Sequence, residues 1–352
     1  MARWPAWLDL AAVVAAALAV GAVFAAAGVP SPVLFGALAA GLLRALAVRG
    51  GVTVPARAST AAQAVIGVSA GALIDVATLR AVAANWVPVL LVTVATLALS
   101  LGGGLLLRLQ PGISPVTGAF AMIAGGASGI VVMARELGAD ARMVAVLQFL
   151  RVLLIVVLMP VIATVAFGAS PGQGGPAVVD DEPGWPAGLL LTVGCSVAGL
   201  VAGRLVRMPV PALLGPLLAA AVVDVTGLGR GADVPAPVEA AAFLVIGLQV
   251  GVSFTLDSLR TVGRALPLAL AVITGLIVGC VGLGAALSAA TGASALDGYL
   301  ATTPGGLYAV LATAGDIGAD VTFVLAVQVL RLFVMLLTAP LVARWLRRSA
   351  GG

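Results

Sequence analysis

The sequence contains twelve apolar stretches of about 17 to 27 residues, joined for the most part by short polar connections. An α-helix needs roughly 20 apolar residues to cross the hydrocarbon core of a membrane. Only 9% of the 352 residues are charged, whereas a soluble domain carries about a quarter charged residues. Spans must be helices or closed barrels, and the alternating strands of a barrel are not evident. We therefore expect an all-α polytopic membrane protein with about 10–12 transmembrane helices.

A polar segment divides the chain into two halves. Residues 168–186 contain four prolines, five glycines and the acidic cluster Asp180, Asp181 and Glu182. A segment of this composition cannot bury enough apolar area to pack as a core, which indicates a solvated linker. The sequence therefore predicts an N-terminal membrane repeat (1–167), an acidic Gly/Pro-rich linker (168–186) and a C-terminal membrane repeat (187–352).

The two halves are similar to each other in sequence. Residues 118–163 and 298–343 are identical at 14 of 46 positions. The matches include residue types that are rare in this chain, so composition does not explain them. They are Asp140 with Asp320, Gln148 with Gln328, Arg151 with Arg331 and Pro160 with Pro340. The halves are therefore homologous repeats, as in many secondary transporters.

The sequence gives less direct evidence on whether the second repeat is inverted relative to the first. Six spans per copy would leave both copies in the same orientation, whereas five would invert the second copy. The loop after the second apolar stretch is basic in the first copy, with Arg44, Arg49 and Arg57, whereas its counterpart contains Asp224, Arg230 and Asp233. Because cytoplasmic loops are enriched in Arg and Lys, this difference favours inverted repeats with one segment per copy that does not cross.

The fifth apolar stretch of each copy carries the first candidate site. Paired glycines loosen a helix, and proline removes an amide donor. Breaks at matching points of two repeats indicate the binding site of a transporter, whereas the alternative is that small residues here only allow close helix packing. The candidate substrate-binding residues of these discontinuous helices are Gly125, Gly126, Ser128, Thr303, Pro304, Gly305 and Gly306.

The last long helix of each copy carries the second candidate site. Arg151 and Arg331 lie about ten residues into these helices, and Gln148 and Gln328 precede them by three residues on the same helical face. An arginine at the membrane centre costs at least about 2.5–3.5 kcal/mol, so each should face the protein interior and have a partner. We expect each Gln–Arg stripe to face the broken helix before it and to contribute to substrate binding.

Acidic residues follow each broken helix and are candidate partners of these arginines. They are Glu136, Asp140, Asp316 and Asp320. One interpretation is a structural ion pair that ties two helices together. The other is that the arginines attract an anionic substrate, or compete with a coupling proton or cation for these acids. We therefore name the four acids as candidate ion- or proton-coupling residues.

Other classes of function have little support in the sequence. The chain has no histidine, which excludes His-based catalytic triads and His metal sites. Cys195 and Cys280 lie in apolar stretches and fit neither a disulfide framework nor a metal site. We expect no enzyme activity, no cofactor and no metal. No loop is long or basic enough to form a DNA-binding domain, so we expect no nucleic-acid partner.

Several short motifs together resemble a known family. They are VPSPVLFG at residues 29–36 and MPVPALLG at 208–215, Pro304 with Gly305 and Gly306, and the Gly-Ala-Asp motifs at 138–140 and 318–320, each followed by a Gln–Arg stripe. On these residues the chain resembles the AbrB-duplication family of bacterial inner-membrane proteins. The resemblance implies kinship with cation/proton antiporters and bile-acid-type symporters, whose repeats are inverted and whose broken helices cross at the substrate site. The chain departs from the Pro-Gly-Gly pattern in the first copy, where Ala124 stands in place of proline.

These observations lead to a functional expectation. We expect a multi-pass protein of the bacterial cytoplasmic (inner) membrane that acts as a secondary transporter of a small solute, with an anion as a candidate class, coupled to protons or cations. The alternative, which the family resemblance brings, is a membrane-embedded regulator of gene expression that acts indirectly and does not transport. The expected partners are the lipid bilayer, the solute and its coupling ion. Small-residue helices such as 11–27 would also allow a homodimer.

Overall fold

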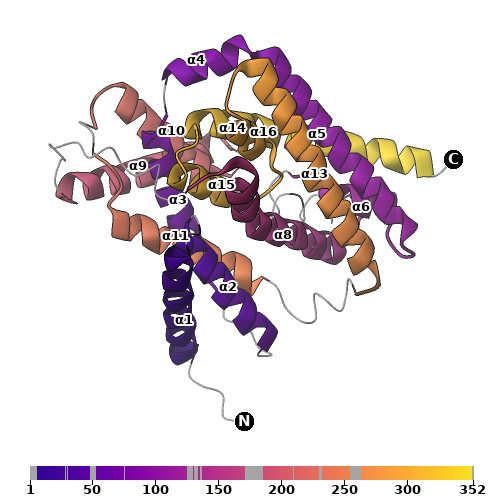
Figure 1. Cartoon of the computed structure of the whole chain (residues 1–352), viewed down its shortest axis with the longest axis horizontal. Coiled ribbons are helices and arrows are strands. Elements are labelled where there is room, and N and C mark those ends of the chain that lie inside the picture. Colours follow the sequence, from indigo (N-terminus) through magenta and orange to yellow (C-terminus); the bar gives the residue numbers. More distant parts are fainter. Residues whose placement is uncertain are drawn as a thin grey trace. The chain divides into compact units, whose positions relative to one another are not determined.

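The computed structural model describes residues 6–27, 29, 31–47, 53–74, 76–124, 130, 134, 137–170, 185–208, 210–229, 232–253 and 263–350. All regular elements in these ranges are helical (Figure 1), which confirms the all-α class. The first half contains α1 (Ala6–Ala26), α2 (Pro32–Ala47), α3 (Ala56–Ala72), α4 (Val76–Ala84), α5 (Trp86–Leu106), η1 (Leu107–Leu109), α6 (Pro115–Met122) and α8 (Ala141–Phe167). The second half contains α9 (Trp185–Leu205), α10 (Pro211–Val225), α11 (Ala236–Val252), η2 (Gly263–Ala265), α13 (Leu266–Thr291), α14 (Ala295–Thr302), α15 (Leu307–Asp316) and α16 (Val321–Ala350).

Within the described residues, six helices are long and apolar enough to cross a membrane. They are α1, α5, α8, α9, α13 and α16, and a seventh span results if α3 and α4, which meet at 84°, count as one. The chain is therefore a multi-pass membrane protein. Fewer spans satisfy the length criterion than the 10–12 expected, because α2, α10 and α11 have only 15 to 17 residues and the fifth stretch of the second half is divided into α14 and α15.

The chain forms two compact units, and each unit combines segments from both halves. Unit 1 comprises Met1–Leu79, Ala169–Thr255 and Leu311–Thr322, so it contains α1 to α3 together with α9 to α11. Unit 2 comprises Arg80–Gly168, Leu256–Val310 and Phe323–Gly352, so it contains α5, α6 and α8 together with α13, α14 and most of α16. The expected boundaries at 167 and 187 thus separate the two copies along the sequence. The two compact units have other boundaries, because each unit combines segments of both copies.

Close helix packing at glycine holds unit 1 together, and it occurs at equivalent positions of the two halves. A side-chain carbon added to Gly67 of α3 would lie 2.5 Å from the carbonyl oxygen of Leu213 in α10. The same addition at Gly247 of α11 would overlap the carbonyl oxygen of Leu34 in α2. Only glycine permits such an approach of two helix backbones. These contacts are related by shifts of 179 and 180 residues, which supports the duplication.

Two polar contacts between α3 and α11 report the direction of these equivalent helices. The hydroxyl of Ser59 donates to Oε1 of Gln249 at 2.5 Å, and the hydroxyl of Ser69 donates to Oε1 of Glu239. A shift of 180 residues relates Ser59 to Glu239 and Ser69 to Gln249. As the residue number rises along α3, that of its partner falls along α11. The two equivalent helices therefore cross in opposite directions.

The equivalent helices α5 and α13 of unit 2 show the same relation, and Figure 1 shows them side by side. A side-chain carbon on Gly279 would overlap the side chain of Leu99, and one on Gly103 would lie 2.9 Å from Cγ1 of Val272. As the residue number rises along α5, that of the contacting residue in α13 therefore falls. Antiparallel packing of equivalent helices is what inverted repeats produce, so both units support the inverted arrangement that the loop charges favour.

Unit 2 holds two short helices in equivalent places. A side-chain carbon on Gly104 of α5 would lie 2.6 Å from the carbonyl oxygen of Gly118 in α6, and one on Gly284 of α13 would lie 2.7 Å from that of Gly298 in α14. Serine N-caps fix the start of both short helices, because Ser114 Oγ and Ser294 Oγ each accept a backbone N–H of the first turn. These contacts fix where α6 and α14 point as they end.

Substitution of Gly199 by alanine tests the close packing in unit 1. A side-chain carbon at Gly199 of α9 would lie 2.5 Å from the carbonyl oxygen of Gly215 in α10. Because backbone has to move to relieve this overlap, we expect Gly199→Ala to lower the unfolding free energy by about 1–3 kcal/mol. Thermal unfolding of the detergent-purified protein measures the effect.

Gly194 of the same helix provides the matched control, since a side-chain carbon there would meet nothing within 4 Å. We expect Gly194→Ala to keep or slightly raise the melting temperature, because alanine favours the helix. Equal losses in both variants would contradict the role given to the close approach.

Candidate functional site

Both halves contain a helix that ends in the middle of its apolar stretch. The helix α6 ends at Met122 and α14 ends at Thr302, which is its equivalent position. The next residues, Ile123 and Thr303, have extended backbone with ψ of 124° and 122°. Proline disfavours helical backbone in the residue before it, which explains the end of α14 at Pro304. The first half has Ala124 in that place and yet α6 ends at the same point. The departure from the Pro-Gly-Gly pattern therefore does not remove the helix end.

In the first half, side chains from α8 bind the carbonyl groups at the end of α6. Gln148 Nε2 donates to the carbonyl oxygens of Phe120 at 2.6 Å and of Ile123 at 2.8 Å. Arg151 Nη1 donates to the carbonyl oxygen of Met122 at 2.5 Å, and Arg151 Nη2 donates to Gln148 Oε1 at 2.8 Å. The amide and the guanidinium thus act as one unit that takes up the acceptors left by the missing helical turn.

The second half repeats this arrangement with α16 and α14. Gln328 Nε2 donates to the carbonyl oxygens of Leu300 at 2.8 Å and of Thr303 at 3.1 Å. Arg331 Nη1 donates to those of Thr302 at 3.0 Å and Thr303 at 2.9 Å, and Arg331 Nη2 donates to Gln328 Oε1. Each Gln–Arg stripe therefore faces the broken helix before it, as the spacing predicted.

These contacts explain why the helix ends are stable in an apolar core. The last four carbonyl groups of an α-helix have no partner within the helix, and an unpaired buried carbonyl is costly. A cation at the helix C-terminus also interacts favourably with the helix dipole. Arg151 and Arg331 are 2% and 4% exposed, and both glutamines are buried. The guanidinium groups therefore stabilise two buried helix ends.

The acids expected to pair with these arginines have other positions. Asp140 is the N-cap of α8, where its Oδ1 accepts the N–H groups of Arg142 and Met143. It lies eleven residues from Arg151, or about 16 Å along the helix axis. Asp320 lies directly before α16, and it is separated from Arg331 by the same number of residues. The predicted pairing with these two acids is therefore wrong, because backbone carbonyls supply the acceptors instead.

Of the other two candidate acids, only Asp316 lies within the described residues. Asp316, at the end of α15, accepts the backbone N–H of Ser31 at 3.0 Å within unit 1. Glu136 lies outside the described residues, as do the candidate binding residues Gly125, Gly126 and Ser128. A role of the four acids in ion coupling stays a prediction.

The break of the second half packs against the helix that carries the arginine of the first half. A side-chain carbon on Gly305 would lie 2.9 Å from Cγ2 of Ile155, and one on Gly306 would lie 3.6 Å from Cγ1 of Val152. In the equivalent place of the first half, Met335 of α16 belongs to the same buried cluster as Ile123. The structure thus brings the two Gln–Arg stripes and the two helix ends into one region of unit 2.

This region combines two positive charges with unused donors. Arg151 directly precedes Val152, which packs against the break, and Arg331 donates to Thr303 just before it, so both arginines belong to elements that meet at the same break. Nε of each arginine is buried and lacks a hydrogen-bond partner among the described residues. The described carboxylates make no hydrogen bond to either guanidinium. Neutral carbonyls cannot cancel these charges, so the region is suited to an anion.

The first turn of α15 also makes this region favourable for an anion. This half-helix begins at Leu307, directly after Gly305 and Gly306. The N–H groups of a first helical turn are not used within the helix, and they favour a negative charge. Pro304 is buried, and Gly305 and Gly306 are partly buried. The candidate residues of the second break therefore connect the C-terminus of one half-helix with the N-terminus of the next.

Sequence reasoning missed several contacts that support this region. Thr302 Oγ1 donates to the carbonyl oxygen of Cys280 in α13 at 2.8 Å. The rings of Phe167 and Tyr299 stack with their centroids 5.3 Å apart, which joins the end of α8 to α14. Ile155 follows Arg151 by four residues, so helical spacing could have placed it on the same face, whereas nothing in the sequence indicates the contact of Phe167.

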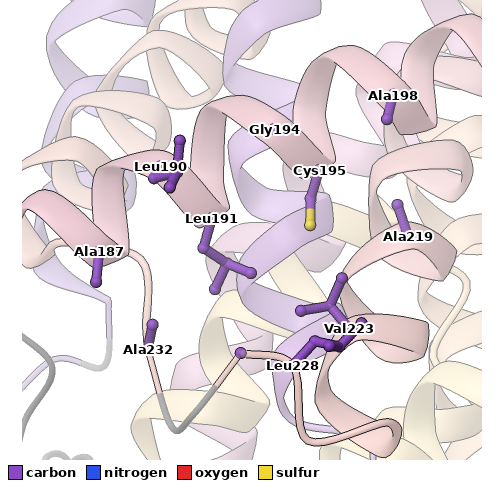
Figure 2. Close-up of a pocket in the computed structure, with 11 residues that line it drawn as sticks. Ala187, Leu190, Leu191, Gly194, Cys195, Ala198, Ala219, Val223, Leu228 and Ala232 are labelled. Carbon is purple, nitrogen blue, oxygen red and sulfur yellow. The ribbon is translucent and has the colours of Figure 1, made fainter.

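A separate apolar cavity of about 580 Å³ lies in unit 1 between α9 and α10 (Figure 2). Its lining contains only Ala, Leu, Gly, Val and Cys195. When the equivalent glycine contacts of the two halves are matched, Ala187 and Val223 of this lining correspond to Asp9 and Arg44 of the first half. In the first half, Arg44 Nη2 and Asp9 Oδ2 form an ion pair at 2.5 Å. A cavity without charged groups is unsuited to an ion, so the candidate site remains the arginine region of unit 2.

Comparison with known proteins identifies relatives over most of the chain. Residues 33–347 match the family described as "Transition state regulatory protein AbrB". The chain belongs to the AbrB family. It is 33% identical over 329 residues to "Putative regulator AbrB" of Escherichia coli (strain K12), an alignment that covers 93% of each chain. It is 24% identical over 301 residues to "Uncharacterized protein YhjN" of Bacillus subtilis (strain 168), over 82% of this chain and 78% of that protein.

Replacement of a buried glutamine tests the role given to the Gln–Arg stripes. The variant Gln328→Leu keeps the size of the side chain but leaves the Leu300 carbonyl and Nη2 of Arg331 without their side-chain partner, and it removes one of the two donors to the Thr303 carbonyl. Each buried group left unpaired costs about 1–3 kcal/mol, so we expect a clear fall in melting temperature, and the same for Gln148→Leu.

Phe333→Leu in α16 is the control, because Phe333 is an exposed apolar residue of the same helix. We expect it to keep a melting temperature close to that of the unmodified chain. If Gln328→Leu behaves like this control, the glutamine does not hold the helix end.

Proposed function

We propose that this protein is a secondary transporter that moves a small anionic solute through unit 2, driven by a proton or cation gradient. The observation that carries the proposal is the pair of buried arginines at two helix ends, each with an Nε donor free of partners among the described residues. Discontinuous helices in corresponding positions of two repeats are a feature of transporter sites. Ionisable residues inside a membrane are rare and usually functional.

The roles of individual residues follow from this arrangement. Arg151 and Arg331 supply the positive charge, and Gln148 and Gln328 hold them at the helix ends. Thr303 binds Arg331 through its carbonyl oxygen, Pro304 ends α14, and Gly305, Gly306 and the first turn of α15 supply backbone N–H donors for the anion. Asp140, Asp316, Asp320 and Glu136 are the candidate groups for proton or cation coupling. The membrane would be the bacterial cytoplasmic membrane, since both relatives come from bacteria.

A regulatory role without transport is the second candidate. The printed names of the family and of the Escherichia coli relative both describe a regulator. A protein embedded in the membrane would affect gene expression indirectly, through a solute that it moves or a partner that it binds. An effect on expression that persists in a variant unable to bind an anion would favour this candidate.

Substitution of the arginines tests the transport proposal. The purified protein is screened by thermal unfolding against phosphate, sulfate, acetate and succinate, and the anion that raises the melting temperature most is then offered in radiolabelled form to proteoliposomes. We expect saturable uptake, and we expect Arg331→Gln and Arg151→Gln to reduce it by tenfold or more, because one lost charged contact corresponds to about that factor.

Arg44→Gln is the matched control, because it removes an arginine from a partly exposed ion pair in unit 1. We expect its uptake to remain within about twofold of the unmodified protein, since such pairs contribute little. Uptake that is unchanged in Arg331→Gln and Arg151→Gln, or the absence of uptake for all four anions, would contradict the proposal.

A further inference from the structure

The helix ends of unit 2 are already occupied by positive charge. In transporters with broken helices, unwound carbonyl groups and half-helix C-termini coordinate the coupling cation. Here the carbonyls of Phe120, Met122 and Ile123 are bound by side chains of α8. Those of Leu300, Thr302 and Thr303 are bound by side chains of α16. The oxygen atoms that a metal cation would need are therefore in use.

A metal cation could enter only by displacing these bonds. At the second helix end it would have to break both bonds of Arg331 Nη1, to the carbonyls of Thr302 and Thr303. The displaced guanidinium would remain buried, since Arg331 is 4% exposed. It would then repel the metal ion at close range in a medium of low dielectric constant. An arginine side chain stays protonated in proteins, so it cannot leave the site by losing its charge.

We propose that Arg151 and Arg331 are resident cations of the two half-helix ends, in the place where a transporter of this architecture would bind its coupling metal cation. This inference rests on the proposed function. It assigns the guanidinium groups a double role, because they donate hydrogen bonds to the carbonyl ends and present their remaining Nε donors to the anion. It follows that anion flux requires neither Na⁺ nor K⁺ at these positions.

The first test is the ion dependence of the unmodified protein. Uptake of the anion found in the thermal screen is measured in proteoliposomes prepared with choline as the only bulk cation, and then with Na⁺ or K⁺ added. We expect rates that agree within about twofold in all three media. A rise of tenfold or more with Na⁺ or K⁺ that persists in Glu136→Gln, Asp140→Asn, Asp316→Asn and Asp320→Asn would overturn the inference and leave the transport proposal standing.

The second test replaces the lost side chain by a free cation. In Arg331→Ala the carbonyls of Thr302 and Thr303 lose a donor, and the vacated space matches a guanidinium ion. We expect guanidinium chloride, at concentrations that leave the unmodified protein unaffected, to raise the melting temperature of Arg331→Ala and to restore part of its uptake. Tetramethylammonium chloride should do neither, because it has no N–H donors. Arg151→Ala tests the other helix end in the same way.

The thermal readout keeps the inference open to refutation where transport fails. If the unmodified protein transports none of the four anions, the proposed function is at fault, and the response of the melting temperature to guanidinium still tests the resident cation. Arg44→Ala is the control, since its ion pair lies in unit 1, and we expect no response. A folded Arg331→Ala that responds equally to guanidinium and tetramethylammonium, or to neither, overturns the inference.

Discussion

The bond between a buried guanidinium and the carbonyl groups of an interrupted helix is the interaction on which unit 2 depends. A helix that stops inside an apolar core leaves acceptors that neither water nor lipid can satisfy. Arg151 and Arg331 donate to these acceptors from neighbouring helices. Gln148 and Gln328 donate to the carbonyls of Phe120 and Leu300, which the arginines do not bind. The unpaired carbonyl groups and the buried charge are each unfavourable alone. Together they are stabilised, because the guanidinium supplies the hydrogen-bond donors and the carbonyl groups supply the acceptors.

Symmetry explains why this arrangement occurs twice within one unit. The equivalent helices α5 and α13 run in opposite directions at their contact, as do α3 and α11. When repeats are related in this way, the same segments of both copies meet around a common axis, and each copy completes the other. The packing of Gly305 against Ile155 is one such contact between copies. The compact units therefore cut across the two sequence halves.

The sequence was sufficient to predict the membrane class and the direction of the Gln–Arg stripes, because these depend on hydropathy and on spacing along a helix. It was insufficient for the partners of the arginines. Charge complementarity favoured Asp140 and Asp320, but both lie at the start of the same helices and so about 16 Å away. The backbone carbonyls that bind instead carry no sequence signature. The paired glycines Gly125 and Gly126 predicted a break in the first half, but the end of α6 at Met122 was not predicted, since Ala124 stands where the second half has proline.

Differences between the repeats show which features the architecture can do without. The ion pair of Asp9 and Arg44 has no counterpart in the second half, where Ala187 and Val223 line an open cavity instead. Pro304 has none in the first half, and yet both helices end at equivalent residues. The glutamine, the arginine and the three carbonyl groups they bind are present in both. A helix end can form without proline, and at both broken helices the carbonyl groups are bound by an arginine and a glutamine.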